Sequence, residues 1–366
     1  MSSAEILPVA RQRACASDTQ QLATRSHAVL AVSDFAPDAD IDVFSRKAQP
    51  GAPSRPGPQL PAPPTGRIGK PRPLSPKTQE TLRILNAIDY PTLYTKVLDL
   101  KTGELIDKST LMQRLGHAQV IYVSESHDNL AHHALQLDIL RQLSARNPKT
   151  TLAMEFLYRS AQPTLDAYVR GDISEAELES KIRDGFGKYY PMYVELLRHA
   201  GTHGLDVVGL NVEASIRRKM VDKGWECLTP EEQKVIAKDI DLSNPAYRKY
   251  LEDALRDHMG PNPPPAELAR MVRLQAIWDE TFGEAIANHL RAASDSERQV
   301  MVVIGSGHVR YKFTAPLKSH TRYPASFKTL VPVEANAENP VDFGELLRSK
   351  VADYVYFSDF APAAVR

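Results

Sequence analysis

The sequence predicts an α/β fold with a small, mainly parallel sheet, flanking helices and a helical insertion. Four short apolar runs have the length and composition of buried strands. They cover residues 120–123, 152–154, 207–210 and 300–304, and each leads into polar side chains. Segments with helical spacing of apolar residues separate the runs, which indicates parallel crossover connections. Because such sheets bind ligands beyond the carboxyl ends of their strands, the polar residues there are candidates for one shared site.

The composition excludes some classes of partner. The chain has 366 residues, of which 42% are hydrophobic, enough for a buried core. Lys plus Arg and Asp plus Glu each number 45, so no net charge attracts nucleic acid or an anionic membrane. No run approaches the roughly 20 apolar residues of a membrane span. We expect a soluble protein with a small-molecule or peptide ligand, and homodimer formation stays open. The two cysteines, Cys15 and Cys227, do not indicate a disulfide framework, and we expect Cys227 in the core.

Residues 1–76 are predicted to form a disordered, proline-rich arm ahead of a domain that spans 77–366. Ten of the 27 prolines lie within 50–76, and proline removes backbone donors and favours extended conformations. A spacer is the favoured role of the arm, and a ligand for a proline-binding partner is the alternative. Arg11 and Arg13 are not followed by the apolar core of an export signal, so the sequence as written predicts a cytoplasmic protein.

Local signals place the remaining elements in order along the domain. Asn129 is suited to cap the helix after the first strand, because its side chain can accept a hydrogen bond from the first turn. A helical cap is expected over about 216–290, ending in a long helix over 266–290. The other predicted elements are helices over 77–84, 109–115, 163–169, 174–182 and 190–200, a hairpin over 96–106, and edge strands over 330–333 and 354–357.

Glu125 and His127 follow the first apolar run directly. Residues two apart share one face of extended backbone, where a carboxylate and an imidazole form an acid/base pair or two ligands of one metal. In isolation such a pair is more often structural, but its place at a strand end favours function. His132 and His133 fall in the first turn of the next helix, where the dipole keeps imidazole neutral and able to coordinate. The alternative is that both rings bond only backbone or water.

Glu155 and His308 complete the set of candidate site residues. Glu155 ends a run predicted to be a central strand, and a buried carboxylate requires a partner or a cation. His308 follows Gly305 and Gly307, which allow backbone amides to approach a ligand, although an ordinary tight turn is the alternative. The motifs GxGxxG, GxSxG, GxxxxGK[ST] and HExxH are absent. The candidates for catalysis or metal binding are therefore Glu125, His127, Glu155 and His308.

Tyr189, Tyr190 and Tyr193 cluster at the start of a predicted helix. A tyrosinate can ligate haem iron while histidine supplies a second contact, whereas packing of the rings at a domain edge is the alternative. These tyrosines and the two histidines at the start of the earlier helix are candidates to bind a cofactor, either haem or a divalent metal ion of unknown identity. In the segment QAIWDET, Trp278 is expected in the core and Asp279 towards the rim of the site.

In their order along the chain, these motifs resemble the ChaN-like family, the haem-binding uptake branch of the Tiki superfamily. The segments are SESHDNLAHH, LAMEF, YYPMY, VVGLN, QAIWDET and VIGSGHV, between about Tyr94 and Tyr311. The resemblance implies a ChaN, Tiki and erythromycin-esterase-like fold and a haem- or metal-binding pocket used in iron or haem handling. It implies functional roles for Glu125, His127, Glu155 and His308.

Relatives in the same superfamily imply a second interpretation. Tiki and TraB proteins resemble metal-dependent peptidases, and erythromycin-esterase-like proteins use the matching Glu and His for hydrolysis. A hydrolase of peptide, ester or imide bonds is therefore the alternative. Two features depart from the family pattern. Ser124 replaces the usual glycine of the first motif, which changes how closely backbone approaches a ligand. Family members are often membrane-anchored lipoproteins, yet Cys15 lacks the apolar lead of a lipoprotein signal.

Overall fold

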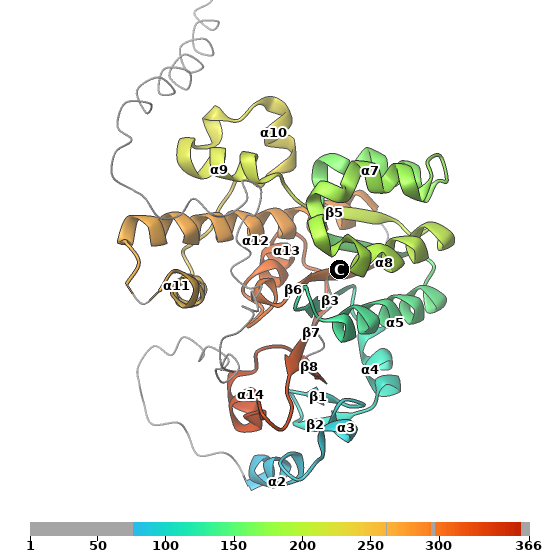
Figure 1. The fold of residues 1–366 in the computed structure, drawn as a ribbon, viewed down its shortest axis with the longest axis vertical. Helices are drawn as coiled ribbons and strands as arrows, with labels where there is room; N and C mark the ends of the chain where they lie inside the picture. Colours follow the sequence, from blue (N-terminus) through green and yellow to red (C-terminus); the bar gives the residue numbers. More distant parts are fainter. Residues whose placement is uncertain (1–75, 261, 294–296, 360–366) are drawn as a thin grey trace, which may run out of the picture.

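The structure, a computed structural model, describes residues 76–260, 262–293 and 297–359. Except for Pro76, the arm predicted over 1–76 lies outside these residues. The described chain forms three layers, with helices on both faces of one sheet (Figure 1). Within these residues, no helix combines the length and the apolarity needed to cross a bilayer.

One eight-stranded sheet forms the middle layer and confirms the predicted α/β class. Its strand order is β2-β1-β8-β7-β3-β6-β4-β5. The six strands from β8 to β5 in this order are parallel, and the hairpin of β1 and β2 joins β8 in antiparallel fashion. The strands are β1 (Val97–Asp99), β2 (Glu104–Ile106), β3 (Val120–Glu125), β4 (Thr150–Tyr158), β5 (Val207–Asn211), β6 (Gln299–Gly305), β7 (Phe327–Glu334) and β8 (Tyr354–Ser358).

The prediction that 330–333 and 354–357 form edge strands is wrong. β7 lies between β3 and β8, and β8 lies between β7 and the hairpin. The hairpin covers β8 because Val97 pairs with Tyr356 as well as with Ile106. The sequence did not predict this order, because the pairing of the hairpin with β8 joins segments that are far apart along the chain.

Two groups of helices cover the two faces of the sheet (Figure 1). Helices α4 to α8 pack on one face, and α2, α3 and α12 to α14 pack on the other. The helices are α2 (Pro76–Leu85), α3 (Tyr90–Leu93), α4 (Lys108–Leu115), α5 (Leu130–Arg146), α6 (Gln162–Val169), α7 (Glu175–Phe186), α8 (Tyr190–His203), α9 (Ala214–Lys223), α10 (Pro230–Val235), α11 (Pro245–Met259), α12 (Pro265–Ala293), α13 (Ala315–Arg322) and α14 (Phe343–Ser349).

Alternating side chains of β3 supply both cores. Ile121 and Val123 belong to the core under α4 to α8, whereas Val120 and Tyr122 belong to the core under α12 to α14. All four are at most 1% exposed, and burying an aliphatic or aromatic side chain of this size stabilises the fold by about 1.5–3 kcal/mol. The first four residues of the strand are thus all apolar because both of its faces are covered.

The predicted start of α5 is confirmed, since the Asn129 side chain accepts a hydrogen bond from the amide of Ala131. The block predicted as a helical cap contains α9 to α12. The long helix α12 joins this block to the sheet: Val272 packs with α11, whereas Phe282 and Ile286 belong to the core against the sheet. One rigid helix therefore connects the insertion to the strand ends.

Cys227 does not have the environment expected from the sequence. It lies in a short 3₁₀ turn, Trp225–Cys227, where it is half-buried. The prediction that it is a small core residue is therefore wrong. The other cysteine, Cys15, lies outside the described residues.

Gly209 controls the register of β4 where this strand carries Glu155. The pairing of β4 with β5 shifts between Met154 and Tyr158, and a Cβ on Gly209 would lie 2.5 Å from the carbonyl oxygen of Tyr158. We expect Gly209→Ala to lower the free energy of unfolding by about 1–3 kcal/mol, since backbone must move to admit the methyl group. Urea denaturation measures this value.

Gly116→Ala is the matched control for that substitution. A Cβ at Gly116 would meet its nearest atom at 3.4 Å, an ordinary contact, so the change should stay within about 0.5 kcal/mol. Equal stabilities of the two variants would contradict the proposed constraint at Gly209.

Candidate functional site

Three neighbouring strands end at the same edge of the sheet and bring the selected side chains together. Glu125 at the end of β3 pairs with Gly305 at the end of β6. On the other side of β6, Met154 of β4 pairs with Val303, and Glu155 follows directly. The strand order β3-β6-β4 therefore places Glu125 and Glu155 on either side of Gly305.

Glu125 is 2% exposed and is surrounded by hydrogen-bond donors. Its Oε1 accepts from Nδ1 of His127 at 2.9 Å and from the hydroxyl of Tyr193 on α8. Nδ1 of His133 lies 3.2 Å from Oε2. Burial by itself raises the pKa of this carboxyl, but the charges of His133 and His127 and the hydrogen bonds of His127 and Tyr193 outweigh burial and lower the pKa to about 2. Glu125 is therefore a buried, ionised carboxylate at neutral pH.

His127 lies between Glu125 and the end of β6. Because its Nδ1 donates to Glu125, the ring directs Nε2 towards Gly305. A Cβ on Gly305 would lie 2.9 Å from Cε1 and 3.3 Å from Nε2 of His127, so the close approach requires glycine at this position. The rings of Phe156 and Tyr189 flank the imidazole, with centroids 4.7 and 6.0 Å away.

A second chain of contacts lies on the other side of Gly305. Oε2 of Glu155 accepts the amide of Gly305 at 2.6 Å, and Oε1 of Glu155 lies 3.7 Å from Nε2 of His308. Nδ1 of His308 bonds Asp279 of α12 at 2.6 Å. Asp279 also accepts from the hydroxyl of Tyr247 on α11 at 2.6 Å. The four side chains that make these contacts are at most 4% exposed.

The two chains of contacts surround Gly305 with two imidazoles and two carboxylates. Each imidazole bonds a carboxylate through Nδ1, a contact that fixes the ring and its tautomer. In this arrangement His127 and His308 can hold or transfer protons at Nε2. The structure thus brings all four candidates, Glu125, His127, Glu155 and His308, to one place.

The two histidines at the start of α5 have different environments. His132 accepts the amide of Ser126 at 3.0 Å through Nδ1, and its Nε2 lies 2.9 Å from Oγ of Ser358. Burial lowers the pKa of His132 to about 4, so it is neutral and anchors the C-terminal strand. His133 points to the site, where its Nε2 donates to the carbonyl of His127 at 3.0 Å. Successive helical residues point about 100° apart, which separates the two.

The three candidate tyrosines also differ. Tyr193 is fully buried and bonds Glu125. The hydroxyl of Tyr190 is buried without a hydrogen-bond partner among the described residues, and burial raises its pKa to about 12. Tyr189 is half-buried beside His127, and its hydroxyl makes no hydrogen bond within the part of the chain that the structure describes. Tyr189 is thus the one of the three that combines partial exposure with contact to the site.

Two expectations for the segment QAIWDET have different outcomes. Trp278 is 6% exposed, as expected of a core residue, and its Nε1 donates to Asn211 at 2.7 Å. Asp279 is fully buried against His308, so its predicted place at the rim is wrong. Tyr247, which bonds Asp279, was not selected from the sequence. No local motif marks it, because the contact depends on the packing of α11 against α12.

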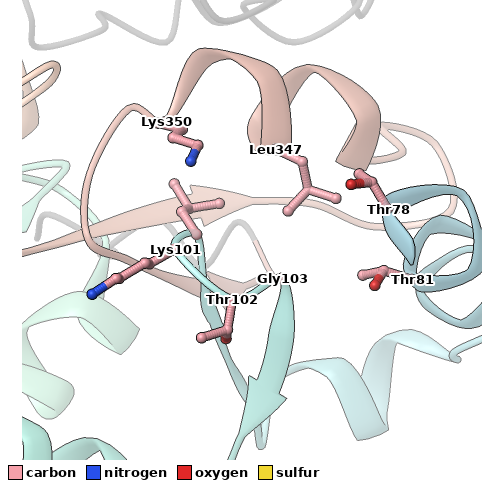
Figure 2. A pocket seen from close by; sticks show the side chains of 8 residues that line it. Thr78, Thr81, Lys101, Thr102, Gly103, Leu347 and Lys350 are labelled. Atoms are coloured by element: carbon pink, nitrogen blue, oxygen red, sulfur yellow. The ribbon is translucent and has the colours of Figure 1, made fainter. Parts of the chain in front are cut away.

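Among residues 76–260, 262–293 and 297–359, no group of three or more His, Cys, Asp or Glu side chains is arranged to hold a metal ion. A cavity of about 100 Å³ lies beside the hairpin of β1 and β2. Figure 2 shows that Thr81 of α2, the turn at Gly103 and Leu347 of α14 line it. It contains none of the selected residues. The cluster around Gly305 is buried, because its four candidate side chains are at most 4% exposed.

Comparison with known proteins identifies the family. A family profile described as "Haem-binding uptake, Tiki superfamily, ChaN" matches residues 111–318, more than half of the chain. The chain belongs to the ChaN family. Every selected residue lies inside the matched range, as do helices α9 to α12 of the insertion. A comparison with curated proteins gave no match.

One of three similar solved structures supports this fold. ChaN of Campylobacter jejuni, described with cofacial haem binding, is 20% identical with a TM-score of 0.55, over 71% of this chain and 95% of that one. The type III effector HopBA1 is 14% identical with a TM-score of 0.39, over 69% and 93%. An erythromycin esterase mutant in its open conformation is 9% identical with a TM-score of 0.37, over 66% and 77%. The first of these shows the ChaN fold, and the other two are weaker likenesses.

The lowered pKa of Glu125 predicts a loss of stability in acid. The folded pKa of about 2 lies below the ordinary value of 4.5, so ionised Glu125 stabilises the fold above about pH 4.5, and this stability is lost as the pH falls towards 2. A difference of this size corresponds to about 3 kcal/mol. Urea denaturation at pH 5, 4 and 3 measures it, with Glu125→Gln as the control that lacks this titration. The same acid loss in both proteins would contradict the assignment.

Proposed function

We propose that this ChaN-family protein binds haem on the half-buried aromatic face formed by Phe156 and Tyr189, which lies in front of the buried His127. The observation that carries the proposal is the position of Tyr189, whose ring lies 6.0 Å from that of His127 and whose hydroxyl makes no hydrogen bond within the described residues. The family description names haem-binding uptake, and the C. jejuni relative is described with haem bound cofacially.

The residues at this face fit haem in their chemistry. A phenolate and an imidazole are both ligands of haem iron. The half-buried ring of Phe156, which stacks on the buried ring of Phe186 with centroids 5.6 Å apart, offers apolar surface to a porphyrin. Bound haem supplies the iron centre, and the protein supplies the ligands. The hydrogen bond from His127 to ionised Glu125 holds the orientation of the imidazole. Tyr189 is the ligand we assign, because Tyr193 is already bonded to Glu125.

A second candidate function is acid/base or metal-assisted hydrolysis of a peptide, ester or imide bond. The specific observation is the buried series Tyr247, Asp279, His308 and Glu155. A carboxylate that orients an imidazole, with a further carboxylate beside Nε2, is an arrangement used for proton transfer. This function uses the side of Gly305 opposite to Tyr189, so the two proposals can be tested separately.

Tyr189→Phe is expected to weaken haem binding at least tenfold, because the phenyl ring keeps the apolar contact but removes the oxygen ligand. Haem titration followed by the Soret band measures the affinity, and metal analysis of the same preparation shows whether a divalent ion is present instead. Tyr190→Phe is the matched control, since its hydroxyl is buried in the helix packing, and it should bind as the unchanged protein does. Equal affinities of all three proteins would exclude Tyr189 as the ligand.

Glu155→Gln separates the two candidate functions. Turnover of a panel of fluorogenic ester and peptide substrates should fall at least a hundredfold if Glu155 takes part in proton transfer, while haem affinity should change less than threefold. The isosteric amide keeps an acceptor for the amide of Gly305, whose distance to Oε2 is 2.6 Å, so the fold should persist. Unchanged turnover in the variant would count against hydrolysis at this site.

A further inference from the structure

Gln275 on α12 is a buried amide without hydrogen bonds. It is 1% exposed, and neither its Nε2 nor its Oε1 has a hydrogen-bond partner among the described residues. An unsatisfied buried polar group costs about 1–3 kcal/mol, and folded proteins contain few of them. Other glutamines show the usual pattern: Nε2 of Gln299 donates to a carbonyl at 2.7 Å, and Nε2 of Gln136 does so at 3.1 Å. Gln275 therefore requires a separate explanation.

The position of Gln275 on α12 directs it to the His308 side of the site. Helical residues three and four apart share a face. Trp278 and Asp279 are three and four residues after Gln275, so the three side chains share one face of α12. Asp279 bonds Nδ1 of His308, and the ring of Trp278 lies 5.9 Å from that of His308. The amide of Gln275 therefore lies on the face of α12 that contacts His308, one turn towards the start of the helix.

We propose that Gln275 binds the carboxamide group of a neutral ligand beside His308. An amide side chain offers one acceptor and two donor hydrogens, and a ligand carboxamide can satisfy an acceptor and a donor together. A carboxylate offers only acceptors, and the buried carboxylates Asp279 and Glu155 repel it. An ester has no N–H group, so it cannot donate a hydrogen bond to the side-chain oxygen of Gln275. The inference is independent of haem binding, because it concerns the opposite side of Gly305.

An aromatic segment that follows His308 packs near Gln275. Tyr311 and Phe313 are half-buried and stack 5.7 Å apart. They pack on the cluster that contains Val272 and Ala276, the neighbours of Gln275 on α12. Tyr311 and Lys312 have φ angles of 61° and 66°, a conformation that costs non-glycine residues about 1–3 kcal/mol each. Such strained residues persist where the surrounding structure holds them in place, so this aromatic segment is a fixed part of the wall beside Gln275.

The first test compares the stability of two isosteric variants. Gln275→Met removes an amide that has no partner, so the melting temperature should stay the same or rise. Gln299→Met removes an amide that donates to Ala118 at the other end of the sheet, so the melting temperature should fall. A fall in Gln275→Met as large as that in Gln299→Met would overturn the proposal, because it would mean that Gln275 only stabilises the fold.

The second test measures ligand binding directly at the site. The chain contains two tryptophans, Trp225 and Trp278, so protein labelled with 5-fluorotryptophan gives two fluorine NMR signals, which Trp225→Phe assigns. Titration with N-acetylglycinamide should shift the Trp278 signal in a saturable way, whereas acetate and methyl acetate should not. The Trp225 signal serves as the internal reference.

The glutamine variants complete this second test. Gln275→Met should bind N-acetylglycinamide about tenfold more weakly or not at all, as expected for the loss of paired hydrogen bonds, while Gln299→Met should bind normally. Equal shifts with all three probes, or unchanged binding in Gln275→Met, would overturn the proposal.

Discussion

Three carboxylates are buried where the parallel strands end, and the rest of the site depends on how each is compensated. Glu125, Glu155 and Asp279 are all at most 4% exposed. Removing a carboxylate from water costs several kcal/mol unless donors replace the lost hydration. Histidine nitrogens, tyrosine hydroxyls and the amide of Gly305 are those donors. Any arrangement of the helices that withdrew one donor would leave a buried charge without compensation, so the donors fix where α8, α11 and α12 pack.

This requirement connects the two faces of the sheet. Tyr193 on α8 approaches Glu125 from one face, and Asp279 on α12 approaches His308 from the other. Gly305, in the plane of the sheet, leaves room for both His127 and Glu155 because it has no Cβ. The helical insertion contributes through Tyr247, which links α11 to the same network. The site therefore depends on tertiary packing of every layer, although its acids and imidazoles come from strand ends.

The sequence predicted those parts of the structure that local rules determine. Apolar runs located strands β3 to β6, and the side-chain chemistry of Asn129 located the start of α5. The position of Glu125 and His308 at strand ends selected them for the site. Relationships between distant segments were not predictable. The hairpin that covers β8, the choice between His132 and His133, and the contact of Tyr247 with Asp279 depend on strand order and on helix rotation. Strand order and helix rotation have no signature within a short stretch of residues.

The two sides of Gly305 differ in a way that bears on function. On the Glu125 side, Tyr189 and Phe156 are half-buried, so the imidazole of His127 lies directly behind accessible aromatic surface. On the Asp279 side, the donors and acceptors are fully enclosed, and Gln275 adds an amide whose hydrogen-bonding capacity is unused within the described residues. An apolar core would tolerate methionine at that position without such a cost. A polar group that lowers stability and contacts no described partner is the kind of residue that a binding role explains and that packing alone does not.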